Sequence, residues 1–587
     1  MVGTLETDVL IVGSGPAGST AAAFLSTYGI RNIQITKYGW LSSTPRAHIT
    51  NQRTMEILRD LGVEEKAKQF ASRQNFMANN VFCHSLSGEE FGRVLSWGNH
   101  PLRKADYELA SPTEICDLPQ TYLEPILLEV AGARGSTIRF NTEFLDLEED
   151  ENGVTATVKD RTTGEDYAIR CKYLIGADGG RSRVAERIGL PMEGQMGLSG
   201  SMNILFDADL TQYVQHRPSV LYWILQPGAE IGGIGAGVIR MVRPWTEWLA
   251  IWGYDLAEGE LKITPEKAEA IVRQLIGDDE VPVKIRSTST WTVNNQYATR
   301  YSTKRVFCAG DAVHRHPPLN GLGSNTSIQD SYNLAWKLSY VLKGKATDAL
   351  LETYCAERQP VGKQIVRRAN ESIKDYPPIF EAIGIGSSSD PETVLRNMEA
   401  RKAPTPEGKK RRRLLHEAIR RKNYEFNAHG VELNQRYQSS AIVPDGTPEP
   451  EYTRDQELYY HATTWPGARL PHVWLEKNGH RISSLDLCGK GRFVVLTGIG
   501  GEGWREAASA VSDKFDIDID VVSIGPAGCD AVDIYGDWYL QSEIAEDGCI
   551  LVRPDMHIAW RARTYDAATG QTLAGVFEDI LGKHISA

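Results

Sequence analysis

Residues 8–20 read DVLIVGSGPAGST, and this stretch decides the fold class. The apolar run Val9–Val12 leads into Gly13-x-Gly15-x-x-Gly18, and alanines follow in a small-residue helix pattern. In such a strand–turn–helix unit, Gly13 allows the tight turn and Gly15 lets the backbone approach a pyrophosphate. Gly18 lets the helix pack close to the strand, and the positive end of that helix faces the phosphates. The stretch therefore predicts a dinucleotide-binding α/β fold.

The second strand of this unit lacks a residue that the pattern calls for. It is expected in NIQITKYGW, residues 32–40, and should end in an acid that binds the adenosine ribose. Thr36 and Lys37 occupy the candidate positions. The Thr36 hydroxyl can still bond a ribose, but the missing acid also favours a glycine loop that binds no nucleotide.

Two later segments place acids where parallel strands end. Residues 174–184 read LIGADGGRSRV, in which a strand ends at Ala177 and Asp178-Gly179 turns the chain. Residues 305–311 read RVFCAGD and end in Gly310-Asp311. Because α/β sheets bind ligands beyond the carboxyl ends of their strands, both acids are expected to face the ligand crevice.

In this order, the three segments resemble the signature of the class A flavoprotein aromatic hydroxylases of the phenol hydroxylase type. That signature is an N-terminal GxGxxG, a middle D-G-x-x-S-x-V and a later G-D. The middle motif usually ends in Val-Arg, whereas this chain has Val184-Ala185. The resemblance implies bound FAD, with Asp178 among its contacts and Asp311 bonding the ribityl chain.

The loop after Asp311 is implied to run along the flavin ring. It reads Pro317-Pro318-Leu319-Asn320-Gly321-Leu322-Gly323, and a long helical pattern containing Asn325 follows. The resemblance places Pro318, Gly321, Gly323 and Asn325 at the cofactor, with Pro318 and Leu319 also at the substrate. The positive end of this helix would stabilise negative charge on reduced flavin.

The segment PRAHITNQRTME, residues 45–56, is implied to lie at the reacting face. The resemblance places Arg46 near the flavin and makes His48 the base that deprotonates a phenol, since histidine accepts protons near neutral pH. A helix-start histidine bonded locally is the alternative. In CDLPQTYLE, residues 116–124, Gln120 is implied to contact the flavin. Asp117 orients His48, bonds the substrate hydroxyl or is an ordinary turn acid.

Between residues 190 and 290 the pattern changes to runs rich in β-branched and aromatic residues. They predict an antiparallel sheet that roofs an aromatic substrate. Tyr222 and Trp223 are candidates for lining the pocket, with core packing as the alternative. Arg240 is a cation in an apolar strand, and we expect it to bond a flavin or substrate oxygen.

The expected fold class is α/β: an FAD-binding dinucleotide fold, an interleaved antiparallel-sheet substrate domain and a C-terminal thioredoxin-like domain. The expected FAD-binding unit spans 1–190, with a first substrate-domain insertion near 79–112, and is completed by 291–370. The substrate sheet spans 191–290. A connecting segment of one or two helices spans 371–450, and the thioredoxin-like domain, which lacks a redox C-x-x-C, spans 451–587.

Composition excludes several other classes for this chain of 587 residues. A net charge of −12 argues against a nucleic-acid binder, and no apolar stretch is long enough to span a membrane. The eight scattered cysteines read as reduced thiols, and His314 and His316 lack the partners of a metal site, so no metal is expected. The start of the chain lacks secretion-signal features, which predicts a cytoplasmic protein.

The resemblance implies an NAD(P)H- and O2-dependent enzyme that converts a substituted phenol to a catechol through a flavin C4a-hydroperoxide. The substrate is expected to be of the 2,4-dichlorophenol or the 2-hydroxybiphenyl type, and the chain to form a homodimer or homotetramer. A flavin-dependent halogenase or a reductase is a less favoured alternative, because the halogenase segment W-x-W-x-I-P is missing. A flavin-binding sensor without catalysis is the third possibility.

Overall fold

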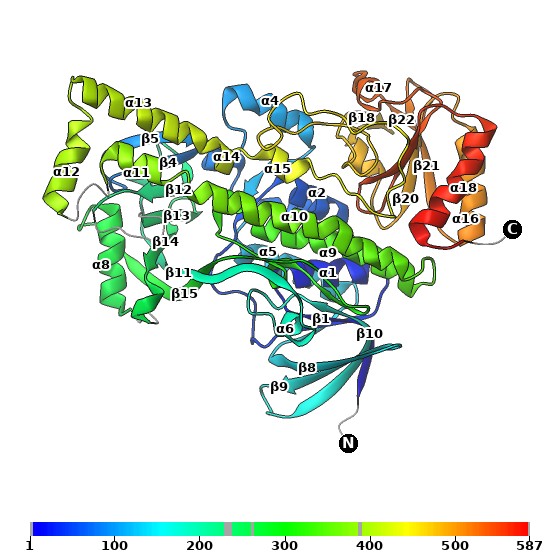
Figure 1. The fold of residues 1–587 in the computed structure, drawn as a ribbon, viewed down its shortest axis with the longest axis horizontal. Helices are drawn as coiled ribbons and strands as arrows, with labels where there is room; N and C mark the ends of the chain where they lie inside the picture. Colours follow the sequence, from blue (N-terminus) through cyan, green and yellow to red (C-terminus); the bar gives the residue numbers. More distant parts are fainter. Residues whose placement is uncertain (1–3, 228–236, 260–262, 386–389, 585–587) are drawn as a thin grey trace.

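The computed structural model describes residues 4–227, 237–259, 263–385 and 390–584. Three large sheets and one two-stranded sheet form within these residues. The long helices α9 (Gly323–Leu342) and α10 (Ala349–Ile373) run across the middle of the molecule (Figure 1). The C-terminal unit (residues 474–581) lies on one side of the view, and the sheet built mainly from residues 192–298 lies on the other. No helix in the described part has the length and apolar character needed to cross a bilayer. The predicted mixed α/β class is confirmed.

The first sheet forms around the glycine-rich stretch that opens the chain. Its strand order is β7-β2-β1-β10-β9-β8, and β16 pairs with β10. Strands β2, β7, β1, β10 and β16 run parallel, whereas β9 and β8 are antiparallel additions. Its strands and helices are β1 (Leu5–Val12), α1 (Pro16–Thr27), β2 (Asn32–Ile35), α2 (Gln52–Leu61), α3 (Glu64–Phe70), α5 (Gln120–Ala133), β7 (Thr137–Arg139), β8 (Thr142–Asp150), β9 (Gly153–Asp160), β10 (Asp166–Gly176), α6 (Arg183–Arg187) and β16 (Val306–Cys308).

Helix α1 packs directly on β1 because the sequence leaves room for it. Val9–Val12 are buried, as expected for a parallel strand with both faces covered. Pro16 occupies the first turn of α1, where no backbone donor is lost. A Cβ at Gly18 would lie 2.1 Å from the Gly13 carbonyl oxygen, so only glycine permits this approach.

The second sheet has the order β17-β15-β11-β14-β13-β12-β4-β5 and is mostly antiparallel. Strands β4 and β5 come from residues 79–95, so an early part of the chain joins a sheet built mainly from residues 192–298. Its members are β4 (Asn79–Cys83), β5 (Glu90–Leu95), β11 (Met192–Asp207), β12 (Ser219–Ile224), β13 (Gly237–Arg243), β14 (Glu247–Tyr254), β15 (Lys284–Ala298) and β17 (His314–Arg315), with α7 (Thr211–Val214) and α8 (Pro265–Ile276) packed on it. Helix α4 (Pro101–Ala110) follows β5 and lies against α2, where Gln52 donates to the Tyr107 carbonyl at 2.9 Å.

The segment between residues 371 and 450 is richer in helix than the one or two helices expected. The described part contains α11 (Pro377–Ile383), α12 (Pro391–Ala400), α13 (Pro406–Arg421), α14 (Asn423–Phe426) and α15 (His429–Leu433). Helices α11 and α13 bury Ile383 and Ile419 in the core of the second sheet. The basic run at 409–413 hides this apolar spacing in the sequence, and its side chains are mainly exposed on α13.

The third sheet forms the C-terminal unit, with the order β19-β18-β22-β21-β20-β23-β24. Strand β20 pairs parallel with β21 and antiparallel with β23, which pairs antiparallel with β24. The phenyl ring of Phe493 meets the Trp336 ring of α9 at 5.8 Å, so this unit shares a core with the first sheet. Its members are β18 (Trp474–Lys477), β19 (His480–Ser483), β20 (Phe493–Thr497), α16 (Gly503–Phe515), β21 (Ile519–Gly525), β22 (Ala531–Val532), α17 (Asp537–Gln541), β23 (Cys549–Val552), β24 (Ile558–Ala562) and α18 (Ala567–Leu581).

Candidate active site

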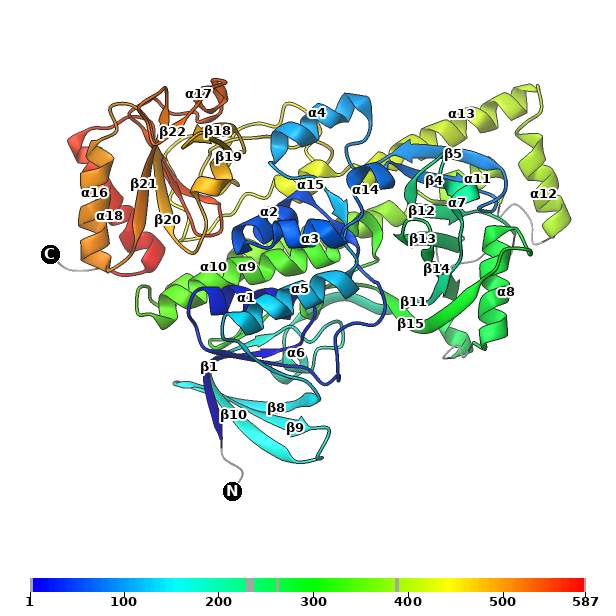
Figure 2. The ribbon, with the colours of Figure 1, turned by 180° about the vertical axis from the view of Figure 1, so that it is seen from behind.

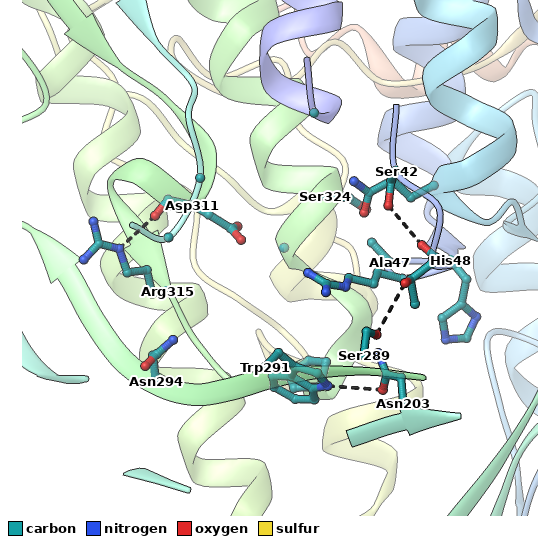
Figure 3. Close-up of a pocket in the computed structure, with 18 of the residues that line it drawn as sticks. Ser42, Ala47, His48, Asn203, Ser289, Trp291, Asn294, Asp311, Arg315 and Ser324 are labelled. Carbon is teal, nitrogen blue, oxygen red and sulfur yellow. Dashed lines mark hydrogen bonds between the residues drawn. The ribbon is translucent and has the colours of Figure 1, made fainter. Parts of the chain in front are cut away.

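A cavity of about 1080 Å³ opens between the first and the second sheet. Most of the predicted site residues line it, although they come from distant parts of the chain. These are Gly13, Gly15, Thr36, Lys37, Arg46, His48, Gln120, Asp178, Trp223, Arg240, Asp311, Pro318, Leu319, Gly321 and Gly323. In the view of Figure 3, Asp311 and Arg315 lie toward one end of the cavity, and Ala47 and His48 toward the other.

Two helices begin at the cavity wall. Gly15 is the N-cap of α1, and α9 begins at Gly323. The backbone N–H groups at a helix start carry partial positive charge and accept anions. Space is open at Gly15, where a Cβ would have Glu124 Oε1 as its nearest atom at 3.9 Å. The cavity therefore fits a ligand that is both large and anionic. A dinucleotide that contains a pyrophosphate has both properties.

Two predicted cofactor residues do not line the cavity. Gly18 serves the packing of α1 on β1. The Asn325 side chain is taken up by the backbone: it accepts from the Asn51 N–H at 3.0 Å and donates to the carbonyls of Ile49 at 2.8 Å and Gly321 at 2.6 Å. The Asn325 amide joins two loops, so its side chain is not free for the cofactor, and a contact between Asn325 and the cofactor stays a prediction.

The two acids at the strand ends have different surroundings. The Asp178 carboxylate accepts from the Ser182 hydroxyl at 2.5 Å and from the backbone N–H of Arg183 at 2.8 Å. Burial raises the Asp178 pKa, and these hydrogen bonds oppose the rise. At Asp311, it is the backbone carbonyl that accepts from Arg315 Nε, at 2.9 Å. Asp178 therefore shapes its own turn, whereas the Asp311 carboxylate is available to a ligand.

Glu124 is a cavity residue that the sequence reasoning missed. It lies on α5, one turn after Gln120, whose side-chain amide donates to Glu124 Oε1 at 2.5 Å. The Ser42 N–H donates to Glu124 Oε2 at 3.0 Å. Burial raises the Glu124 pKa, partly offset by these two hydrogen bonds. The sequence did contain a signal for Glu124: it is an acid four residues after Gln120, the predicted flavin contact.

His48 and Asp117 are brought together by the two-stranded sheet. Strand β3 (Ile49–Thr50) pairs antiparallel with β6 (Cys116–Asp117), and the Leu118 N–H donates to the His48 carbonyl at 2.7 Å. His48 Nδ1 consequently lies 3.1 Å from Asp117 Oδ2. Asp117 is completely buried and does not line the cavity. Of the three possibilities given for Asp117, the contact with His48 is the one that this geometry favours, because Asp117 is not among the residues that line the cavity.

Arg240 is a buried cation at the same place. It is 2% exposed on β13, donates through Nη1 to the Pro45 carbonyl and has Nη2 3.8 Å from Asp117 Oδ1. Within the described part of the chain, its Nε and Nη2 atoms have no hydrogen-bond partner. Burial lowers the Arg240 pKa to about 10, so the guanidinium stays charged at neutral pH. A buried guanidinium with free donors at a cavity wall is a site for a negatively charged oxygen.

Tyr222 and Trp223 are neighbours on β12, but only Trp223 lines the cavity. The buried Nε1–H of Trp223 has no hydrogen-bond partner among the residues that the structure describes. Tyr222 faces the other side of the sheet, where its hydroxyl donates to the Arg217 carbonyl at 3.1 Å. Successive residues of a strand point to opposite faces, so only one of the pair can reach the cavity. The prediction that Tyr222 lines the pocket is therefore wrong.

The sheet side of the cavity is divided into an apolar and a polar part. Leu221, Val238, Leu249 and Ile251 line it from β12, β13 and β14. Strands β11 and β15 contribute the polar side chains, which are Ser201, Asn203, Ser289 and Trp291. The sequence analysis missed these four residues, although their spacing at every second position of a strand was a signal. Trp291 Nε1 donates to Asn203 Oδ1 at 3.2 Å (Figure 3).

Comparison with known families agrees with this geometry. Residues 6–369 match the family described as "FAD binding domain". Residues 463–583 match the family described as "Aromatic-ring hydroxylase, C-terminal". The two matches cover the first sheet, the second sheet and the C-terminal unit.

Individual relatives resemble the chain over almost its whole length. A 2,4-dichlorophenol 6-monooxygenase of Delftia acidovorans is 56% identical over 580 residues, covering 99% of each chain. A phenol 2-monooxygenase of Pseudomonas sp. (strain EST1001) is 51% identical, covering 95% of this chain and 90% of its own.

Among solved structures, the flavin-dependent monooxygenase PieE in complex with FAD and substrate is similar with a TM-score of 0.95 and 45% identity, covering 99% of this chain and 100% of its own. The dinucleotide that fits the cavity is therefore FAD, and NAD(P)H and O2 are the co-substrates. The chain belongs to the family of FAD-dependent aromatic-ring hydroxylases.

Proposed function

We propose that this enzyme hydroxylates a substituted phenol at the carbon next to its hydroxyl group and releases a catechol. One atom of O2 enters the ring, the other leaves as water, and NAD(P)H supplies the two electrons. The observation that carries the proposal is the cluster of His48, Asp117 and Arg240 at the wall of the cavity. A proton acceptor beside a buried cation is the arrangement that converts a phenol into a phenolate.

Bound FAD, reduced by NAD(P)H, supplies an electrophilic oxygen atom from O2, and a phenolate is far more reactive toward it than a phenol. We assign His48 Nε2 as the acceptor of the phenol proton, because Nδ1 faces Asp117. Asp117 orients the ring and stabilises the imidazolium. The free donors of Arg240 hold the phenolate oxygen, and the apolar residues of β12–β14 exclude water from the reacting ring.

The flavin itself is proposed to be held by the residues that share its end of the cavity. The loops at Gly13, Gly15 and Asp178 would take the pyrophosphate side, with Thr36 and Lys37 near the adenosine. The Asp311 carboxylate would bond the ribityl chain. Arg46, Gln120, Pro318, Gly321 and Gly323 would surround the ring, and Trp223, Pro318 and Leu319 would contact the substrate.

For the substrate, a phenol of the 2,4-dichlorophenol type is favoured by the relative from Delftia acidovorans and by the apolar sheet wall. A 2-hydroxybiphenyl type is the alternative. The test is a panel of substituted phenols, each assayed for NAD(P)H oxidation and for the catechol formed. Catechol formed in equal amount to the NAD(P)H consumed supports the proposal. NAD(P)H oxidation that no phenol stimulates would contradict it.

The pH dependence of hydroxylation is expected to respond in opposite directions to two substitutions. Burial and the Arg240 charge lower the His48 pKa, whereas Asp117 raises it. A base works only when unprotonated, so kcat/KM falls as pH drops through this lowered pKa. Arg240→Gln should raise the His48 pKa and move the acid limb to higher pH. Asp117→Asn should lower it and move the limb to lower pH.

The profiles of kcat/KM against pH for the two variants and wild type check this expectation. Both variants should also be slower, because Arg240→Gln removes the phenolate partner and Asp117→Asn weakens the base. Acid limbs that stay together in all three proteins would remove His48 as the titrating group.

Affinity for FAD is expected to fall as pH rises, through Glu124. Its pKa is already raised by burial, and an anionic pyrophosphate near Gly15 would raise it further. Binding would then take up a proton, and affinity would drop by about tenfold for each unit by which FAD raises this pKa. Glu124→Gln should remove that dependence. Flavin fluorescence titrations from the ordinary glutamate range up to alkaline pH measure it, and parallel pH curves for both proteins would refute the assignment.

We also propose that the enzyme works in the cytoplasm and forms a homodimer or homotetramer. All eight cysteines are free, as expected for a protein in a reducing compartment. Light scattering of the purified FAD-bound protein determines the oligomeric state, and fractionation of the producing cells determines the location.

A further inference from the structure

We propose that the C-terminal unit holds the His48 segment in place through α2, and so sets how efficiently the enzyme couples NAD(P)H oxidation to hydroxylation. This inference rests on the function proposed above for His48. It assigns a role to a unit that carries no cavity residue and no C-x-x-C pair. The residues that exert the effect are positioning residues, because none of them touches the cavity.

Helix α2 looks like a surface helix in the sequence but is not one. Its sequence QRTMEILRDL has charged side chains at every turn, yet nearly all of them are buried. Arg53, Glu56 and Asp60 are spaced three and four residues apart and so form one stripe along the helix. Met55 and Leu58 face the opposite way, into the core of the first sheet. A buried charged stripe needs partners, and these partners identify what the helix is built to bind.

Partners from the C-terminal unit meet the centre of this stripe. Arg53 Nη2 donates to the Asp555 carbonyl at 2.7 Å. Arg469, which is 2% exposed, donates from Nε to Glu56 Oε2 at 2.9 Å. Both contacts lie deep in the interface, so they keep the unit docked on α2.

Two more links lie at the rim of the interface. Arg59 binds Asp486 in a bidentate pair, with Nε–Oδ1 at 2.6 Å and Nη2–Oδ2 at 2.8 Å. The Lys490 N–H donates to Asp60 Oδ1 at 2.9 Å, and its ammonium donates to the Asp60 carbonyl at 2.7 Å. Figures 1 and 2 both place α2 between the C-terminal unit and the sheet that carries Arg240.

The C-terminal unit is itself anchored, so it can act as a fixed support. Arg553 donates to both oxygens of Glu357 on α10, at 2.6 and 2.9 Å. Lys337 on α9 donates to Glu357 Oε2 at 2.8 Å. These three side chains are completely buried. Removing any partner would leave a buried charge, so the unit has little freedom to move on the long helices.

From α2 the connection to the reacting groups is short. The N-cap of α2 is Asn51, whose side chain accepts from the Thr54 N–H at 3.0 Å. The Asn51 N–H donates to Asn325, and the amide of Asn325 bonds both Ile49 and Gly321. A shift of α2 would therefore change the distance between His48 and Asp117 and move the loop implied to border the flavin.

The test severs only the two rim links. In the double variant Arg59→Gln/Lys490→Gln, the Arg59 and Lys490 side chains that are lost are 31% and 49% exposed. The buried Asp60 carboxylate loses a cation but keeps its hydrogen bonds from the Lys490 backbone N–H at 2.9 Å and from the Tyr332 hydroxyl at 2.9 Å. The control is Arg505→Gln, which breaks the exposed Arg505–Asp530 pair inside the C-terminal unit. Arg59→Lys/Lys490→Arg keeps both charges and should restore most of the effect.

Hydrogen exchange of the FAD-bound proteins is the first readout. Amides of residues 46–51 are expected to exchange on the order of tenfold faster in the double variant, while β13 is unchanged. The second readout is coupling: the fraction of NAD(P)H that ends as hydrogen peroxide should rise, with little change in FAD affinity. The control should match wild type in both.

A lower melting temperature with wild-type exchange at 46–51 and wild-type coupling would overturn the inference, because the contacts would then only stabilise the fold. The exchange measurement does not depend on the substrate. If wild type hydroxylates no phenol, the proposed function fails, whereas unchanged exchange in the double variant makes only this inference fail.

Discussion

Replacing His48 with glutamine is expected to lower phenol hydroxylation by about 10²- to 10⁴-fold, the usual contribution of a general base, while FAD remains bound. The reason is local: His48 lines the cavity, and its Nδ1 lies 3.1 Å from the buried Asp117. Glutamine keeps a polar side chain of similar reach but cannot take up a proton. The acid limb of the pH profile should disappear with the base.

Rapid-quench measurement of catechol formation separates this effect from flavin reduction. Phenols that already ionise below the assay pH should lose much less activity, because they need no base. His216→Gln, at an exposed position, is the matched control. Equal losses for acidic and weakly acidic phenols would show that His48 does something other than accept the phenol proton.

Gly13→Ala is expected to give protein that cannot hold FAD. Gly13 has a φ of +115°, and a Cβ there would lie 2.1 Å from the Ala177 carbonyl oxygen. Both the left-handed conformation and the contact exclude a side chain, so the loop between β1 and α1 must shift. The backbone N–H groups of that loop are the ones expected to meet the pyrophosphate.

Flavin absorbance per protein and the FAD dissociation constant measure this loss. Gly29→Ala is the control, because Gly29 also has a positive φ, of +72°, but its Cβ would meet no atom within 4 Å. That control should lose some stability and keep its colour. A yellow Gly13→Ala protein with wild-type affinity would mean that the loop does not carry the cofactor.

The sequence alone was sufficient for the fold class and for the cofactor. Gly13-x-Gly15-x-x-Gly18 encodes a close approach of backbone to backbone, which depends on the absence of Cβ atoms and hence on residue type alone. The acids Asp178 and Asp311 could be located because strand ends in a parallel sheet meet at one edge. The family resemblance added His48, Arg46 and Gln120, which all line the cavity.

The sequence could not decide positions where a side chain has a choice of partners or of faces. Tyr222 and Trp223 are equally plausible pocket residues in the sequence, and only the face that β12 turns to the cavity separates them. Asn325 stands next to cavity residues, yet its amide is used by the backbone of Ile49, Asn51 and Gly321. Hydrogen-bond competition of this kind depends on chain segments far apart in sequence.

What the sequence by itself determined, then, are the local conformations that only certain residues permit: the glycine turns, the buried strands and the helix starts. The tertiary structure alone decided which charges meet. Glu56 with Arg469 and His48 with Asp117 are pairs separated by long stretches of chain. The physical reason is that the sequence around a charged residue does not specify its partner. Burial nevertheless requires a partner, because an unpaired buried charge is costly.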